Sequence, residues 1–285
     1  MRTYIDCIPC FMTQALRAAK AASSDELIQR RVLDSVAKMV PDLPLEERPP
    51  AIAQRVYRAV HDITGNADPY REMKSQANQT ALSLYPRLKE IVVGSDDPLL
   101  AACKLAIAGN SIDFGPQVLH TDLDTIVDSA LSVPFVCDDY QQFRSEVASC
   151  TRLLYLGDNA GEIVFDRLLV EQLLQYNRQL DITFVVREAP IINDATMEDA
   201  VVVGLDKLAR VVSNGSDAPA TILSQCSPEM LEMFNSADII IAKGQGNYES
   251  LSDEDANIFF LLKCKCHVVA DLLDVNVGDA VLRKR

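Results

Sequence analysis

The stretch 153-LLYLGDNAGEIVFDRLLVEQLL-174 decides the expected fold. It opens with a short apolar run of strand length and continues with apolar side chains repeating at the helical period. Gly157 and Gly161 flank the junction, where glycine permits the backbone conformations of a tight turn. A buried strand followed at once by a helix is typical of a parallel α/β unit. The junction also holds Asp158 and Asn159, where many nucleotide-binding folds need bare backbone.

Strand and helix patterns alternate through the rest of the chain, whereas the N-terminal half is helical almost throughout. The expected helices of that half are 7–22, 23–40, 49–64, 68–92 and 97–110. The expected strands of the C-terminal half are 152–157, 182–188, 209–214, 238–244 and 267–271, with a helix over 257–263. We therefore predict a three-layer α/β/α fold with a mainly parallel sheet over residues 151–285, preceded by a helical subdomain over residues 1–150.

Composition limits the classes of partner. The chain has 285 residues, 48% of them hydrophobic, and 27 Lys and Arg against 41 Asp and Glu give a net charge of −14. So acidic a surface disfavours binding to nucleic acid. The N-terminus lacks the pattern of a signal peptide, and no apolar run is long enough to span a bilayer. We expect a cytoplasmic protein with no membrane partner; its oligomeric state is left open.

Polar residues follow the predicted strands at the edge where ligands bind in parallel α/β sheets. Asp158 and Asn159 follow the first strand, and Asp194 follows the second. Carboxylate and carboxamide oxygens are the ligands that Mg²⁺ and Mn²⁺ prefer. These three residues are therefore candidate metal ligands.

Cations reach the same edge from two strands, as Arg187 and Lys243. Gly244, next to the lysine, lets backbone N–H groups approach an anion closely, and the helix after Gly161 points its N-terminus there. A metal and two cations at one edge suit a phosphate group. Each residue also has a local alternative: Asp158 is a good helix N-cap, and Glu162 a first-turn charge that complements the helix dipole.

Three segments resemble signatures of the damage-control phosphatase family that carries the acidic-residue-methyltransferase-type metal-binding domain, formerly a domain of unknown function. They are GDNAGEIVFD at 157–166, INDATMEDA at 192–200 and KGQGNYESL at 243–251. The N-terminal CIPC and AGNSIDFG at 108–115 are similar to the archaeal and bacterial subgroup. The resemblance spans nearly the whole chain, with the motifs in the family's order.

The resemblance implies a metal-dependent phosphatase acting on small phosphorylated metabolites, such as sugar phosphates, in metabolite damage control. Mn²⁺, Co²⁺, Ni²⁺ or Mg²⁺ would be the cofactor. Motif match places the metal ligands at Asp158, Asn159 and Asp194, and the catalytic groups at Asp158, Lys243 and Arg187; the family often has lysine at the last position. We assign substrate binding to Asn110, Asp113, Glu162, Gly244 and Asn247. The first two have a local alternative as a helix C-cap and a turn.

Cys7 and Cys10 stand at the start of the first helix, where a helix N-terminus lowers a thiol pKa. A redox role, or a zinc site completed by Cys264 and Cys266, is one interpretation. Two small hydrophobic side chains packing on one side of the helix is the other.

Two other functions fit the residues. A methyltransferase that uses S-adenosylmethionine would share the strand and glycine turn, but its cofactor needs open backbone where Asp158 and Asn159 lie. A binding protein would hold a metal and a phosphorylated ligand without hydrolysing it. Binding of S-adenosylmethionine and release of phosphate separate these alternatives from the phosphatase.

Overall fold

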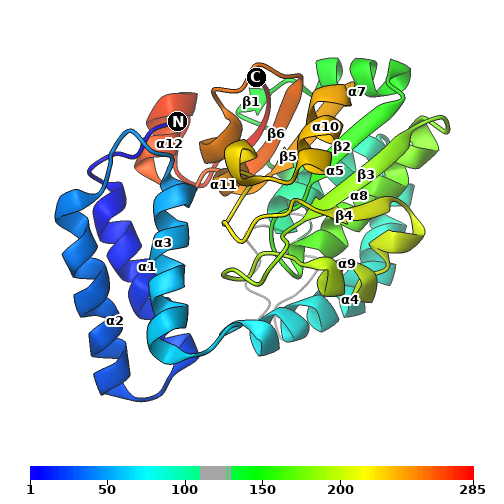
Figure 1. Ribbon diagram of the computed structural model, residues 1–285. Coiled ribbons are helices and arrows are strands. Elements are labelled where there is room, and N and C mark those ends of the chain that lie inside the picture. The colour runs from blue at the N-terminus through cyan, green and yellow to red at the C-terminus, as the bar shows by residue number, and fades with distance from the viewer. Residues whose placement is uncertain (110–126, 128–129) are drawn as a thin grey trace.

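A seven-stranded sheet forms the centre of the protein in a computed structural model, which describes residues 1–109, 127 and 130–285 (Figure 1). The strand order is β1-β7-β6-β5-β2-β3-β4. The strands are β1 (Cys137–Asp138), β2 (Arg152–Leu156), β3 (Asp181–Val186), β4 (Arg210–Ser213), β5 (Ile239–Lys243), β6 (Ile258–Lys263) and β7 (Ala280–Lys284). Strands β2 to β6 are parallel, and β7 pairs antiparallel with β6. The predicted α/β fold with a mainly parallel sheet is confirmed.

The strand order reverses at β2. The chain proceeds from β2 to β3 and β4 on one side, then returns to place β5 on the other side of β2. The two connections leave β2 and β5 in opposite directions, which opens a crevice beyond the carboxyl ends of these two strands. The metal-ligand candidates of the first motif follow β2, and the lysine motif begins at the end of β5.

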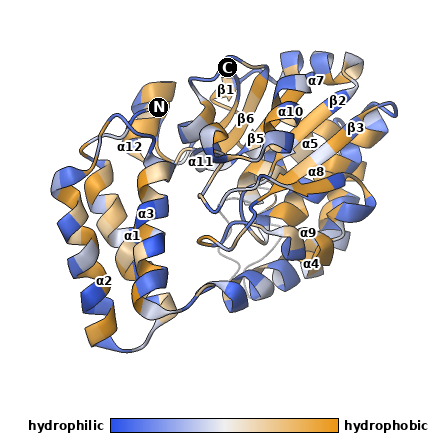
Figure 2. Ribbon diagram, in the orientation of Figure 1, coloured by the Kyte–Doolittle hydropathy of each residue, from blue (hydrophilic) through white to orange (hydrophobic). Residues whose placement is uncertain are grey.

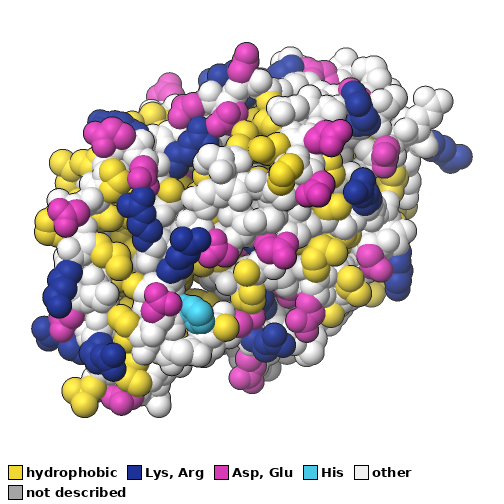
Figure 3. Space-filling view, in the orientation of Figure 1, with side chains coloured by type: hydrophobic (Ala, Val, Ile, Leu, Met, Phe, Trp, Pro, Cys, Tyr) yellow, Lys and Arg dark blue, Asp and Glu magenta, His cyan; other side chains and the backbone are white. Residues whose placement is uncertain are grey.

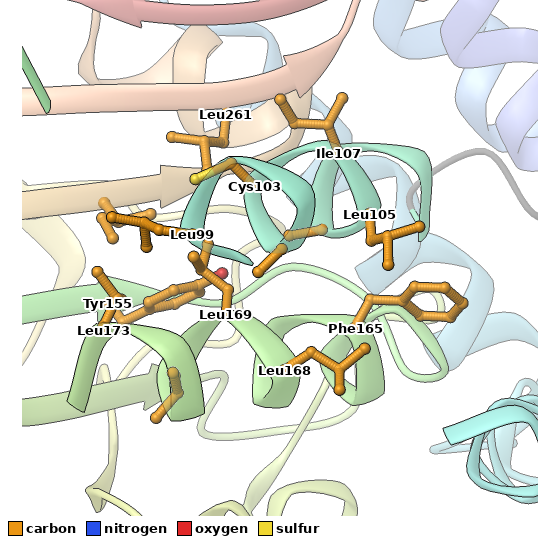
Figure 4. Packing of buried hydrophobic residues seen from close by; sticks show 14 of the residues in the cluster. Leu99, Cys103, Leu105, Ile107, Tyr155, Phe165, Leu168, Leu169, Leu173 and Leu261 are labelled. Carbon is orange, nitrogen blue, oxygen red and sulfur yellow. The ribbon is translucent and has the colours of Figure 1, made fainter. Parts of the chain in front are cut away.

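Helices cover both faces of the sheet because alternate strand residues point to opposite sides. Leu153 and Tyr155 join a core with helices of one face, and Leu154 and Leu156 join a second core. The first face carries α4 (Arg71–Gly94), α5 (Pro98–Gly109), α7 (Tyr140–Ser149), α8 (Glu162–Tyr176) and α9 (Met197–Val202). The second carries α10 (Pro228–Ser236), α11 (Gly244–Leu251) and α12 (His267–Leu273). Figure 4 shows Leu105 of α5 beside Phe165 of α8 in the first core.

Three N-terminal helices form a separate bundle: α1 (Cys7–Ala22), α2 (Glu26–Met39) and α3 (Pro49–Thr64). Each is amphipathic, and their apolar sides meet in a third core (Figure 2). Proline at the first turn of α3 and Gly65 in the left-handed conformation after its end set the limits of that helix. Figure 1 shows the bundle standing beside the carboxyl ends of the strands.

Asp217 connects the bundle to the sheet layer. Its carboxylate accepts hydrogen bonds from Gln54 Nε2 at 2.5 Å, Arg58 Nε at 2.9 Å and Arg58 Nη2 at 2.8 Å. Helices α4, α5 and α7 instead belong to the core of the sheet. The division into domains at residue 150 stays a prediction.

Two elements near the C-terminus differ from expectation. Residues 258–263, expected within a helix, form β6, and residues 267–273, expected to start as a strand, form α12. Short apolar runs give no usable periodicity, so a fully buried strand and a buried helix look alike in sequence. Within the described part of the chain, no helix combines the length and hydropathy needed to cross a bilayer.

Candidate active site

A cavity of about 240 Å³ lies between the carboxyl ends of the strands and the helical bundle. Asp158, Asn159 and Asp194 line it from the sheet side. Phe11 and Gln14 of α1 line it from the bundle side, as do residues at the start of α3. The three candidate metal ligands therefore line one cavity, and the bundle forms its opposite side.

Backbone pairing brings the ligands together. Residues 159 and 194 form an isolated antiparallel bridge. Ala195 N donates to Asp158 O at 2.8 Å, and Ala160 N donates to Asn193 O at 2.8 Å. The turn after β2 is thus tied to the loop after β3 through the backbone. The assignment of Asp158, Asn159 and Asp194 as metal ligands stays a prediction.

Gly244 is required by its contact with Asp158. It has φ of 79°, and a Cβ atom added there would lie 1.9 Å from Asp158 Oδ2. Only glycine accommodates both this backbone conformation and this approach. Because Gly244 has no side chain, the Asp158 carboxylate can occupy the space next to the start of α11.

Asn159 is oriented by two carboxylates. Its Nδ2 donates to Asp158 Oδ2 at 2.8 Å and to Glu162 Oε2 at 3.0 Å. These contacts direct the Asn159 NH₂ group toward the two carboxylates. The Asn159 Oδ1 atom is then the one that can accept a cation.

Arg187 is buried and holds Asp194. Its Nε donates to Asp194 Oδ2 at 2.8 Å, and Ala220 N approaches the same oxygen at 3.3 Å. The guanidinium also contacts Gly157 O and Thr221 Oγ1, at 3.4 and 3.5 Å. Arg187 is 1% exposed. The described residues that line the cavity do not include it.

Lys243 is likewise buried, behind the ligands. Its Nζ lies 2.6 Å from Glu162 Oε1, 3.0 Å from Asp166 Oδ1 and 2.9 Å from Ala106 O, so each of its three protons has an acceptor. Burial alone would lower the pKa of Lys243, but Asp166 and Glu162 raise it well above its usual value. Since Glu162 in turn accepts from Asn159, the ammonium group is linked to the ligands through one carboxylate.

The electrostatics of the cavity favour a cation. Burial, the Glu162 carboxylate and the Asp194 carboxylate raise the pKa of Asp158 to about 8. Burial also raises the pKa of Asp194, against the opposing effect of Arg187. A bound divalent ion offsets this repulsion and favours the ionised acids. The described residues contain no group of three or more His, Cys, Asp and Glu side chains suited to a metal. Two acids and one amide fit Mg²⁺ or Mn²⁺, which keep several waters or take substrate oxygens.

Several residues of the cavity were not expected from the sequence. Lys265 lines it as an exposed cation, and Gln245 and Glu249 of α11 line it nearby. Ile192 and Ala220, which also line it, have positive φ values of 47° and 63°. Such conformations are rare for residues with a side chain and are concentrated at functional sites. Nothing local in the sequence marks them.

One further candidate, Asn247, supports the strand ends. Asn247 is buried, and its Nδ2 donates to Lys243 O at 2.7 Å and Gly157 O at 3.3 Å, which ties β5 to β2. Asn110 and Asp113 lie outside the described residues.

The described residues give no support for the four-ligand zinc site at the cysteines. All eight are free thiols, and Cys7, Cys10, Cys264 and Cys266 belong to no metal-binding group among the described residues. Burial is the main cause that raises the pKa of Cys7, which disfavours an activated thiolate there.

The sequence profile of the "Damage-control phosphatase ARMT1-like domain" matches residues 3–281. The chain belongs to this family. The damage-control phosphatase of Pyrococcus horikoshii is 38% identical over 283 residues, covering 99% of this chain and 97% of that protein. The damage-control phosphatase of Archaeoglobus fulgidus is 37% identical over 284 residues, covering 97% of each. An uncharacterized protein of Methanocaldococcus jannaschii is 38% identical over 290 residues, covering 98% of this chain and 94% of its own length.

The fold comparison agrees with the family assignment. The crystal structure of a DUF89 family protein from Pyrococcus horikoshii superimposes with a TM-score of 0.92 at 34% identity. The similarity covers 100% of this chain and 99% of that chain. Both the bundle and the sheet layer therefore belong to the shared ARMT1-like architecture.

Proposed function

We propose that this chain is a metal-dependent phosphomonoesterase that hydrolyses small phosphorylated metabolites, in the manner implied by the names of its damage-control phosphatase relatives. The observation that carries the proposal is the meeting of Asp158, Asn159 and Asp194 in one cavity. A cavity of about 240 Å³ is a suitable size for a phosphate group with a small organic part.

Asp158, Asn159 and Asp194 would hold the divalent cation, Mn²⁺, Co²⁺, Ni²⁺ or Mg²⁺, because their donor atoms are oxygens. When bound, such an ion neutralises phosphate charge and activates water. Arg187 fixes the Asp194 carboxylate, and Lys243 acts through Glu162 on the amide of Asn159. We propose that both cations position ligands and do not touch the phosphate, because both are buried in ion pairs.

Among the described residues that line the cavity, Lys265 carries a positive charge. We propose that its ammonium group contacts the phosphoryl oxygens. Gln245 and Gly246 line the same cavity at the first turn of α11, where backbone N–H groups and the helix dipole favour an anion. Asp158 accepts a hydrogen bond from the attacking water and orients it. The water oxygen bonds to phosphorus and the phosphorus–ester oxygen bond breaks; one proton of the water passes to the ester oxygen, so that the alcohol and inorganic phosphate are the products.

The test is a panel of phosphate monoesters assayed for phosphate release with each of the four metals and after chelation. We expect metal-dependent release that Asp158→Ala and Asp194→Ala abolish, with circular dichroism spectra like that of the wild type. Binding of metal and ester without release under any pairing supports the binding-protein alternative. Wild-type turnover by either variant overturns the metal assignment.

A further inference from the structure

A second cavity, of about 250 Å³, adjoins the candidate active site. It lies between α3, the segment that follows α3 and the loop after β3. Ile192 lines both cavities, and Asn193 and Asp194 follow it directly. In Figure 3 a hollow opens between the bundle side of the molecule and the remainder, next to a histidine side chain.

We propose that this second cavity binds the leaving group of the substrate and that it selects phosphate esters of aromatic or heteroaromatic alcohols. The inference rests on the proposed function, because the phosphate is taken to lie at Asp158 and Asp194. An ester held there extends past Ile192 into the neighbouring space.

The walls of the second cavity suit a flat apolar ring. Tyr57 and Val60 of α3, Tyr70, and Ile191 of the loop after β3 line it, and all four are buried members of the third core. Burial raises the pKa of both tyrosines, so their rings are uncharged and do not repel an anionic ester. An apolar cavity of about 150 Å³ already holds benzene in another protein, so this larger space has room for two fused rings.

Polar groups of the second cavity suit ring heteroatoms. Arg58 and Asp217 line it as an ion pair with an N–O distance of 2.8 Å, and His61 and Asn66 also line it. The ion pair also ties α3 to the sheet layer, which fixes the opposing walls relative to each other. A ring with polar atoms at its edge therefore finds hydrogen-bonding partners.

The loop after β3 lines both spaces through Ile192. Ile192 has φ of 47°, a rare conformation for a β-branched residue, and its position between the cavities is set by this turn. The loop that carries Asp194 thus borders both cavities.

The experiment compares the binding of two phosphonates, which resist hydrolysis, by calorimetry with Mn²⁺ present. The probes are 1-naphthylmethylphosphonate and methylphosphonate. Ala67→Trp, in the segment after α3, and Ala189→Trp, in the loop after β3, each add a large side chain at the lining of the second cavity. One informative variant therefore remains if the other fails to fold. Ala21→Trp, exposed on α1 and part of neither cavity, is the matched control.

We expect the wild type and Ala21→Trp to bind the naphthyl probe at least about tenfold more tightly than methylphosphonate. The filling variants should lose this preference and keep their affinity for methylphosphonate. Equal binding of the two probes by the wild type, or a preference that survives both filled variants, overturns the proposal. Phosphate release from small esters tests the proposed function separately: a wild type that releases phosphate but shows no preference refutes only the second cavity.

Discussion

Replacing Gly244 by alanine should remove metal binding by displacing a single ligand. The new Cβ would lie 1.9 Å from Asp158 Oδ2 and 2.5 Å from its Cγ, where contacts below 3.0 Å essentially never occur. The carboxylate must therefore move by more than about 1 Å, a misplacement that is able to reduce catalysis about 100-fold. Alanine at φ of 79° adds a backbone cost of about 1–2 kcal/mol.

Gly65→Ala is the matched control. Gly65 has a similar φ of 70°, but an added Cβ there meets nothing within 4 Å. The control therefore carries the backbone cost without the clash. Both variants should lose about 1–2 kcal/mol of unfolding free energy, and only Gly244→Ala should lose the site.

The assay combines urea unfolding, Mn²⁺ titration by calorimetry and phosphate release from an ester that the wild type hydrolyses. We expect Gly244→Ala to lose measurable Mn²⁺ binding and at least about 100-fold in kcat/KM, with Gly65→Ala close to the wild type in both. If Gly244→Ala binds Mn²⁺ as tightly as the wild type, the placement of the metal against Asp158 is refuted.

Three further predictions concern charges at the site. Lys243→Met removes the cation that the buried Glu162 and Asp166 carboxylates share and should cost about 3–5 kcal/mol in urea unfolding. Lys89→Met, at a pair whose lysine is 44% exposed, should cost less than about 1 kcal/mol; equal losses would contradict the buried pairing. Because the pKa of Asp158 is raised to about 8, the metal-free site holds a proton below that pH and must release it on binding. Mn²⁺ affinity by calorimetry should then fall up to about tenfold per pH unit below about 8 and level off above it; affinity independent of pH would contradict this. Lys265→Met should raise KM for phosphate esters about tenfold with Mn²⁺ affinity retained; unchanged steady-state kinetics would remove the residue from the site.

The sequence predicts best those elements that have local signals at both ends. Helices 7–22 and 49–64 were predicted with the bounds that α1 and α3 have, the second because proline and glycine delimit it. The strand and helix around the Asp158 turn were predicted because a continuous apolar run changes there to apolar residues at helical spacing. The apolar runs at 258–263 and 267–273 show no such change of spacing. The first was wrongly predicted as a helix and the second as a strand.

Strand ends predict which residues share an edge but not where their side chains point. Asp158 and Asp194 were expected together and do meet in the cavity. Lys243 and Arg187 were expected to face a phosphate, yet both are buried in ion pairs, since strand register and helix packing decide the orientation. Gln14 enters the cavity only because the bundle docks against the sheet layer, a contact between distant segments that no local pattern reveals.

Asp158→Asn offers the most direct test of the proposed metal site. The raised pKa means that the metal-free protein already tolerates an uncharged group at this position, so the amide should preserve the fold while removing the anionic ligand. Mn²⁺ stoichiometry and phosphate release would be measured on the same dialysed samples. We predict one Mn²⁺ per chain and chelator-sensitive release for the wild type, and neither for Asp158→Asn at an unchanged melting temperature. Full Mn²⁺ binding and turnover by Asp158→Asn would contradict the account.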